Sequence, residues 1–173
     1  MSNFGTPLRL DQIRDGDRIE LLADDADLKA IAERLGLGRL ERLDAHAVLS
    51  RAGHHLRACG RLRASLEQSC VVTGEPVPAH LDEPFELSFM PEPTQSSPDA
   101  EVELKGDDCD VIFHDGATIA LGDAIADTLA LSLDPYPRSA GAEAVLKEAG
   151  VLSEEQAGPF AALARLRQGS GEE

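Results

Sequence analysis

The sequence predicts an α+β fold, in which two or three helices cover an antiparallel sheet or a partly closed β-barrel that contains a long hairpin. Apolar and polar side chains alternate along residues 39–70 on both sides of a turn signal, which is typical of a hairpin with one buried face. A second alternating segment covers residues 79–90. Apolar residues recur at helical spacing in residues 25–36 and 119–133, which predicts two covering helices.

The chain before residue 37 is expected to form two short strands and a helix. Residues 6–23 carry the strands, separated by Asp15-Gly16-Asp17. Asp24 or Asp25 is placed to cap the following helix, because a short carboxylate accepts hydrogen bonds from the free N–H groups of the first turn. A glycine at position 36 then ends the helix.

The alternating pattern also gives the hairpin a register. With Ala52 and Gly53 as a two-residue loop, Ala45 faces Gly60, and every pair on that face is apolar or small. A slip of one residue would bury arginines, so the buried face restricts the register. The pairs expected on the other face are His46 with Cys59, Asp44 with Arg61 and Arg42 with Arg63.

Residues 1–138 are predicted to form a single α+β domain. Prolines and serines between residues 91 and 107 predict a flexible acidic loop within it, and Asp134-Pro135-Tyr136-Pro137 stops the helix at 120–133. Residues 139–173 are expected to be a linker, with a short helix near 142–149, followed by a C-terminal amphipathic helix at 153–167. A capping-box pattern marks the start of that last helix.

The charge of the chain restricts its partners. The net charge is −16, and residues 76–173 hold 20 acidic but only 5 basic residues. Most of such a surface would repel a polyanion such as RNA and would attract a basic ribosomal or assembly protein. The alternative is that the acidity only keeps the protein soluble.

One cluster of basic residues is an exception to the acidity of the chain. On the predicted register the cluster shares one hairpin face, where guanidinium groups suit contact with phosphate or with a partner. The alternative is a solvated outer face balanced by Asp44 and Glu67. Aromatic residues for base stacking are missing nearby, so sequence-specific reading of single-stranded RNA is not expected. The candidate residues for RNA or partner binding are Arg42, Arg57, Arg61 and Arg63.

No catalytic residues, metal ligands, cofactor or small-molecule substrate are expected. A zinc site needs about four nitrogen or sulfur ligands, usually in pairs, and the cysteines and histidines near Cys70 show no paired spacing. No nucleophile elbow or phosphate-binding glycine loop occurs. Since no apolar run approaches the ~20 residues of a membrane span and no signal sequence is evident, a cytoplasmic protein without a membrane partner is expected.

Three segments together resemble the YceD family of bacterial and plastid large ribosomal RNA subunit accumulation proteins. They are residues 66–77 around Cys70, the strand Phe85–Phe89, and residues 119–138. The segment Pro159-Phe160-Ala161-Ala162-Leu163 resembles the alphaproteobacterial branch of the family. Many members carry Cys-x-x-Cys where this chain has Cys70-Val71-Val72-Thr73, so the second thiol is replaced.

The resemblance implies a non-enzymatic factor in large-subunit assembly or rRNA accumulation, and the acidity of the chain predicts that this factor acts by binding a basic ribosomal or assembly protein. A direct RNA-binding module using the arginine face is the alternative, followed by a metal protein or an enzyme. The resemblance also implies structural roles for one set of motif residues: Cys70, Thr73, Glu75, Pro76, Asp134, Pro135, Tyr136 and Pro137.

Overall fold

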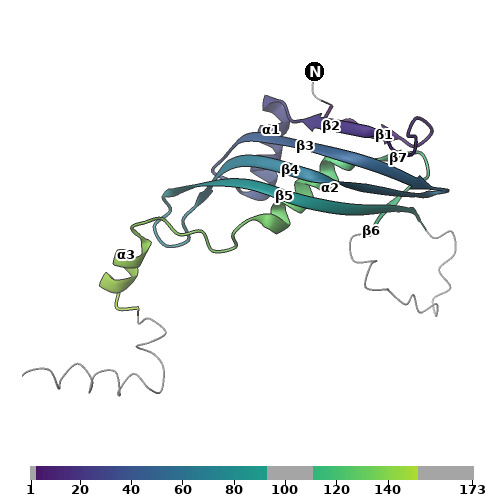
Figure 1. Cartoon of the computed structure of the whole chain (residues 1–173). Coiled ribbons are helices and arrows are strands. Elements are labelled where there is room, and N and C mark those ends of the chain that lie inside the picture. The colour runs from purple at the N-terminus through teal and green to yellow at the C-terminus, as the bar shows by residue number, and fades with distance from the viewer. Residues whose placement is uncertain (1–2, 93–110, 152–173) are drawn as a thin grey trace, which may run out of the picture. The chain divides into compact units, whose positions relative to one another are not determined.

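The computed structural model describes residues 3–92 and 111–151 (Figure 1). The chain divides into two compact units: the first contains residues 1–68 and 78–135, and the second contains residues 69–77 and 136–173. The expected loop at 91–107, apart from its first two residues, and the expected helix at 153–167 lie outside the described residues. The predicted single domain that ends at residue 138 stays a prediction.

A five-stranded sheet forms most of the first unit, in the order β2-β3-β4-β5-β6. Strands β2, β3 and β4 pair antiparallel, whereas β6 runs parallel to β5. The described sheet ends at β2 and β6, so it is an open mixed sheet and not a closed barrel. The strands are β2 (Arg18–Leu22), β3 (Arg39–Ala52), β4 (His55–Ser69), β5 (Pro76–Pro91) and β6 (Val111–His114).

A second, two-stranded sheet pairs β1 (Leu8–Arg9) antiparallel with β7 (Thr118–Ile119). The helices are α1 (Asp25–Leu35), α2 (Leu121–Ser132) and α3 (Ala142–Glu148), and the last belongs to the second unit. The α+β class predicted from the sequence is confirmed. No helix among the described residues is both long and apolar enough to span a membrane.

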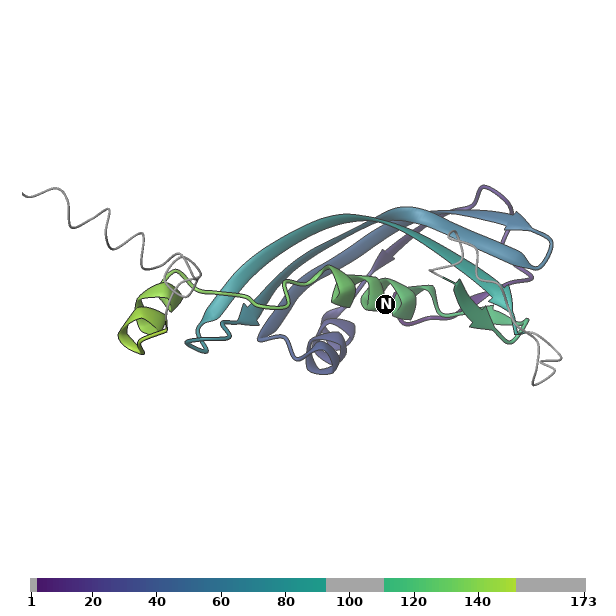
Figure 2. The ribbon, with the colours of Figure 1, turned by 90° about the horizontal axis from the view of Figure 1, so that it is seen from below.

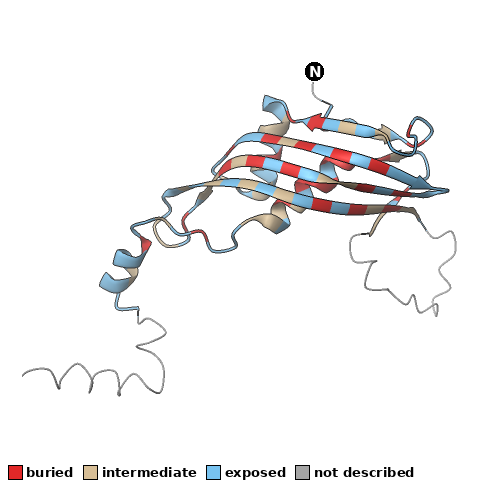
Figure 3. Ribbon diagram, viewed as in Figure 1, coloured by how far each residue is buried: buried red, intermediate tan, exposed pale blue. Residues whose placement is uncertain are grey.

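Helices α1 and α2 lie on the same side of the sheet, and the described residues of the first unit place no helix on its other side (Figure 2). Buried and exposed residues alternate along β3, β4 and β5 (Figure 3), as expected for strands with one face in the core. Ile31 of α1 and Ile125 and Leu129 of α2 pack in the same buried cluster as the inward residues of the strands. The sheet therefore has an inner face under the helices and an outer face toward solvent.

The start of α1 follows the sequence prediction. The Asp24 carboxylate accepts hydrogen bonds from the backbone N–H groups of Ala26 and Asp27, both at 3.1 Å. The Asp27 carboxylate in turn accepts from the N–H of Asp24 at 3.2 Å. This reciprocal capping box satisfies donors that have no partner within the helix, so Asp24 is the cap.

The predicted hairpin register is wrong by two residues. The loop consists of Gly53 and His54, and Gly60 faces Ala47 instead of Ala45. Gly53 has a φ of 66°, whereas His54 has no positive φ, which is the type II′ pattern that favours glycine in the first loop position. Because the slip equals the two-residue period of side chains in a strand, the buried and exposed faces stay as predicted. The exposed pairs become Val48 with Cys59, His46 with Arg61, Asp44 with Arg63 and Arg42 with Ser65.

The alternating sequence pattern also did not predict a β-bulge further along the hairpin. Leu40 faces Leu66 but Arg42 faces Ser65, so Glu41 is an extra residue in β3. The bulge returns Leu40 to the buried face although it lies an odd number of positions from Leu43.

Two glycines in the first unit allow backbones to approach closely. A Cβ atom on Gly60 would lie 1.9 Å from the His46 carbonyl oxygen. A Cβ on Gly122 would lie 1.9 Å from the Phe4 carbonyl oxygen, where the first turn of α2 packs on the N-terminal segment. Neither position can hold a side chain without displacing the backbone.

Candidate interaction surfaces

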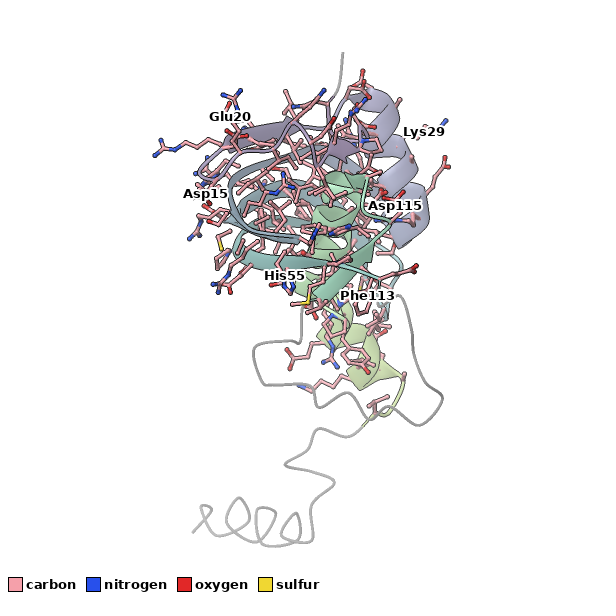
Figure 4. All side chains as sticks on the ribbon, turned by 90° about the vertical axis from the view of Figure 1, so that its right-hand side faces the viewer. Asp15, Glu20, Lys29, His55, Phe113 and Asp115 are labelled. Carbon is pink, nitrogen blue, oxygen red and sulfur yellow. The ribbon has the colours of Figure 1, made fainter. Side chains whose placement is uncertain are left out.

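The outer face of the sheet holds the predicted arginine cluster. β3 positions Arg42, and alternation along β4 places Arg57, Arg61 and Arg63 on the same side. Their side chains are 46–62% exposed. Figure 4 shows the two sides of the first unit, with Glu20 of β2 on the outer side and Lys29 of α1 on the helical side.

Each of these arginines lies against a carboxylate. Arg42 Nε is 2.6 Å from Asp44 Oδ1, and Arg57 pairs with Glu86. Arg61 donates from Nε to Asp82 Oδ1 at 2.8 Å and from Nη2 to the Asp82 carbonyl oxygen at 3.0 Å. Arg63 Nε is 3.6 Å from the second oxygen of the same Asp82 carboxylate.

The pKa of Asp82 reflects this arrangement. The hydrogen bond from Arg61 lowers it most, burial opposes the change, and the charges of Arg61 and Arg63 lower it further. Asp82 therefore stays ionised at neutral pH and partly neutralises both arginines.

Charges alternate across the outer face. Glu20 faces His46, His46 faces Arg61, and Arg61 pairs with Asp82, so one row of polar side chains crosses four strands with a carboxylate at each end. The alternating pattern predicted the arginine cluster but not its partners Asp82 and Glu86. The signal was present, because both occupy polar positions of the alternating stretch 79–90, but their partners depend on β5 lying beside β4.

The helical side is more acidic. Residues 24–35 and 121–134 carry seven carboxylates and two cations, Lys29 and Arg34. Arg34 pairs with Asp127 of α2 at 3.2 Å, and the Asp127 side chain remains 70% exposed. The two sides of the first unit therefore differ in charge, with a mixed outer face and an acidic helical side.

In the second unit, Cys70 organises a tight turn. Its sulfur accepts from the N–H groups of Val72 and Thr73, both at 3.4 Å, and from that of Ser139 at 3.3 Å. The Cys70 N–H donates to the Glu75 carbonyl at 2.8 Å. Gly74 completes the turn with a φ of 73°, a conformation that other residues rarely adopt.

The same donors change the acidity of Cys70, whose side chain is buried. Burial raises its pKa, but hydrogen bonds from Thr73 and Ser139 have the larger combined effect and lower the pKa to about 6. The thiol is therefore largely ionised at neutral pH.

Thr73 lies three residues after Cys70 and forms hydrogen bonds within the second unit. Its hydroxyl donates to the Glu75 carboxylate at 3.1 Å and lies 3.1 Å from the Ser139 hydroxyl. Among residues 3–92 and 111–151, no three His, Cys, Asp or Glu side chains gather in a group that could hold a metal ion. The role of Thr73 in this turn is to form hydrogen bonds with Glu75 and Ser139.

The remaining motif residues occupy connecting segments. Pro76 begins β5, and the Pro137 carbonyl accepts from the Val71 N–H at 2.9 Å within the second unit. In the first unit, the Asp134 carbonyl accepts from the Gln68 side chain at 2.9 Å, and Pro135 follows it. Tyr136 is exposed.

Comparison with known protein families gives one identification. The family model described as "Large ribosomal RNA subunit accumulation protein YceD" matches residues 58–167, which is more than half of the chain. No curated protein and no solved structure matches the chain. The description of the family implies a role in the accumulation of large-subunit ribosomal RNA. The chain belongs to the YceD family.

Proposed function

We propose that the protein supports accumulation of large-subunit rRNA as a non-catalytic assembly factor that binds a basic ribosomal or assembly protein. The observation that carries this proposal is the ion pairing of the arginine face. Each of its four arginines lies against Asp44, Asp82 or Glu86. A phosphate backbone placed there would meet these carboxylates as well as the guanidinium groups, and the repulsion would offset much of the attraction.

The overall charge supports the same proposal. A chain of net charge −16 attracts basic proteins from a distance and repels RNA. Ribosomal and assembly proteins that are not yet in their RNA sites expose basic surfaces, so an acidic partner suits them electrostatically.

Direct RNA contact through the arginine face is the second candidate. The exposure of these side chains favours it, because exposed ion pairs contribute only about 0–1 kcal/mol and phosphate could displace them. Charge reversal of Arg57, Arg61 and Arg63 would then weaken association with large-subunit precursors, more at low salt than at high salt. Asp82→Asn would strengthen it, because two arginines lose their carboxylate. If co-sedimentation of both variants equals that of wild type at every salt concentration, the arginine face does not bind RNA.

The first candidate is tested with the full chain and two probes. One probe is the total protein of large ribosomal subunits, freed of RNA by extraction and nuclease, and the other is protein-free large-subunit rRNA. We expect the immobilised chain to retain basic proteins from the first probe at low salt and to retain no rRNA. Retention of the rRNA alone would overturn the proposal.

A further inference from the structure

We propose that the exposed stripe of α2 formed by Asp123, Asp127 and Leu131 is the surface that binds the basic partner, and that the partner presents a basic segment with an apolar side chain. The inference rests on the proposed function and adds the docking surface and the chemistry of the segment. All three residues belong to the first unit.

Helical geometry defines the stripe. Positions four residues apart lie on one line along a helix, and Asp123, Asp127 and Leu131 are all exposed. The opposite side of α2 is in the core, where Ile125 and Leu129 are fully buried. Helix α2 lies beside the inner face of the sheet (Figure 2). Its buried residues therefore pack on the sheet, and the exposed stripe lies on the opposite side of the helix.

Leu131 is the unusual member of the stripe. Its exposed fraction is 86%, the highest of the large hydrophobic side chains in the described part of the chain. Single exposed leucines are common on protein surfaces, but this one follows two exposed carboxylates on the same line. An apolar contact beside negative charges matches a segment in which a leucine-like side chain is flanked by lysine or arginine.

The end of the helix adds to the negative potential. The last turn of α2 has no basic residue, so no cation of the helix itself offsets the negative end of the helix dipole there. Arg34 of α1 reaches Asp127, yet the Asp127 carboxylate stays largely exposed. A cation from a partner can therefore approach both Asp127 and the carbonyl end of α2.

The negative charge of the stripe favours a basic protein segment over RNA or a second copy of the chain. RNA would place phosphates against carboxylates, and a second copy of the chain would bring two acidic stripes together. The outer sheet face suits a basic segment less well, because its four arginines would repel such a segment. On the stripe, Asp127 also pairs with an arginine, Arg34, but its side chain stays 70% exposed. A basic protein segment with an apolar side chain complements both the negative charge of the stripe and the exposed Leu131.

The test uses two synthetic peptides with the same number of lysines, one with leucine at every fourth position and the other with serine there. We expect Leu131→Gln to weaken binding of the lysine–leucine peptide about tenfold and to leave the lysine–serine peptide unchanged. Asp123→Asn/Asp127→Asn should weaken both peptides, and less so at high salt. The control Glu143→Gln/Glu148→Gln changes the net charge equally in α3 and should have little effect on either peptide. Thermal melting confirms that each variant is folded.

The same variants are then compared on the RNA-free protein of large subunits. If wild type retains basic proteins and both stripe variants retain them equally well, the stripe is not the docking surface, although the proposed function stands. If wild type retains none, the proposed function itself fails. Loss of retention in the stripe variants and not in the control supports the inference.

Discussion

Gly60→Ala tests the register at the centre of the sheet. The added Cβ would lie 1.9 Å from the His46 carbonyl oxygen and 2.9 Å from Ala47 Cα. Carbon–oxygen contacts between strands are normally about 3.3–3.6 Å, so β3 and β4 would have to separate locally by roughly 1.4 Å. Both clashing atoms belong to the backbone, and no rotation of a side chain can relieve them.

The expected cost follows from two contributions. Overpacking costs about 1–3 kcal/mol, and each weakened hydrogen bond of the strand pair adds about 0.5–1.5 kcal/mol. We expect Gly60→Ala to lower the free energy of unfolding by about 3 kcal/mol. For a chain of this size, that corresponds to a fall in Tm of about 6–12 °C.

Denaturant and thermal unfolding of matched variants measure this cost. Gly5→Ala is the control, because its Cβ would meet Asp27 Oδ1 at an ordinary 3.4 Å, and it should change stability by less than about 0.5 kcal/mol. Ala47→Gly should not rescue Gly60→Ala, since removing the Ala47 methyl group leaves the clashing backbone in place. A loss below about 1 kcal/mol, or rescue by Ala47→Gly, would refute the observed register.

Other variants test the second glycine, an outer-face ion pair and the thiolate. Gly122→Ala should cost about 3 kcal/mol in unfolding experiments, because its Cβ would lie 1.9 Å from the Phe4 carbonyl oxygen. Asp82→Asn should cost less than about 1 kcal/mol by the same measurement, because its pairs with arginine are exposed. Burial raises the pKa of Cys70, but hydrogen-bond donors lower it from 9.0 to about 6. Between these values the unfolded state holds the proton and the native state does not, so this contribution to stability grows as pH rises from about 6 to 9 and is lost below about 6. Cys70→Ser should abolish that rise in pH-dependent unfolding, and an unchanged profile would show that the thiolate is not responsible.

The hairpin shows how far a sequence pattern determines a fold. Alternation along residues 43–66 correctly predicted which residues face the core, because that depends only on a period of two, whereas Leu40 lies beyond the bulge. It could not separate registers that differ by two residues, since both bury the same side chains. Turn chemistry decided between them, because Gly53 occupies the first loop position of a type II′ turn. The only local sign of the bulge at Glu41 is the odd spacing between Leu40 and Leu43.

The candidate surfaces were predictable to a similar degree. Spacing along β4 placed Arg57, Arg61 and Arg63 together, but their carboxylate partners come from β5, and strand order is a tertiary property. The hydrogen bond from the Ser139 N–H to Cys70 likewise joins residues far apart in sequence. Sequence composition gave the acidity of the chain, whereas only the fold separates an acidic helical side from an outer face of mixed charge.

The proposed choice of a basic protein over RNA is decided by a retention experiment with the full chain across a salt series. The two probes are RNA-free large-subunit proteins and protein-free large-subunit rRNA. We expect basic proteins to bind at low salt and to be released as salt rises, because screening weakens the attraction between exposed charges. We expect no retention of rRNA at any salt concentration. Retention of rRNA with a steep salt dependence, together with no retention of protein, would contradict the proposal.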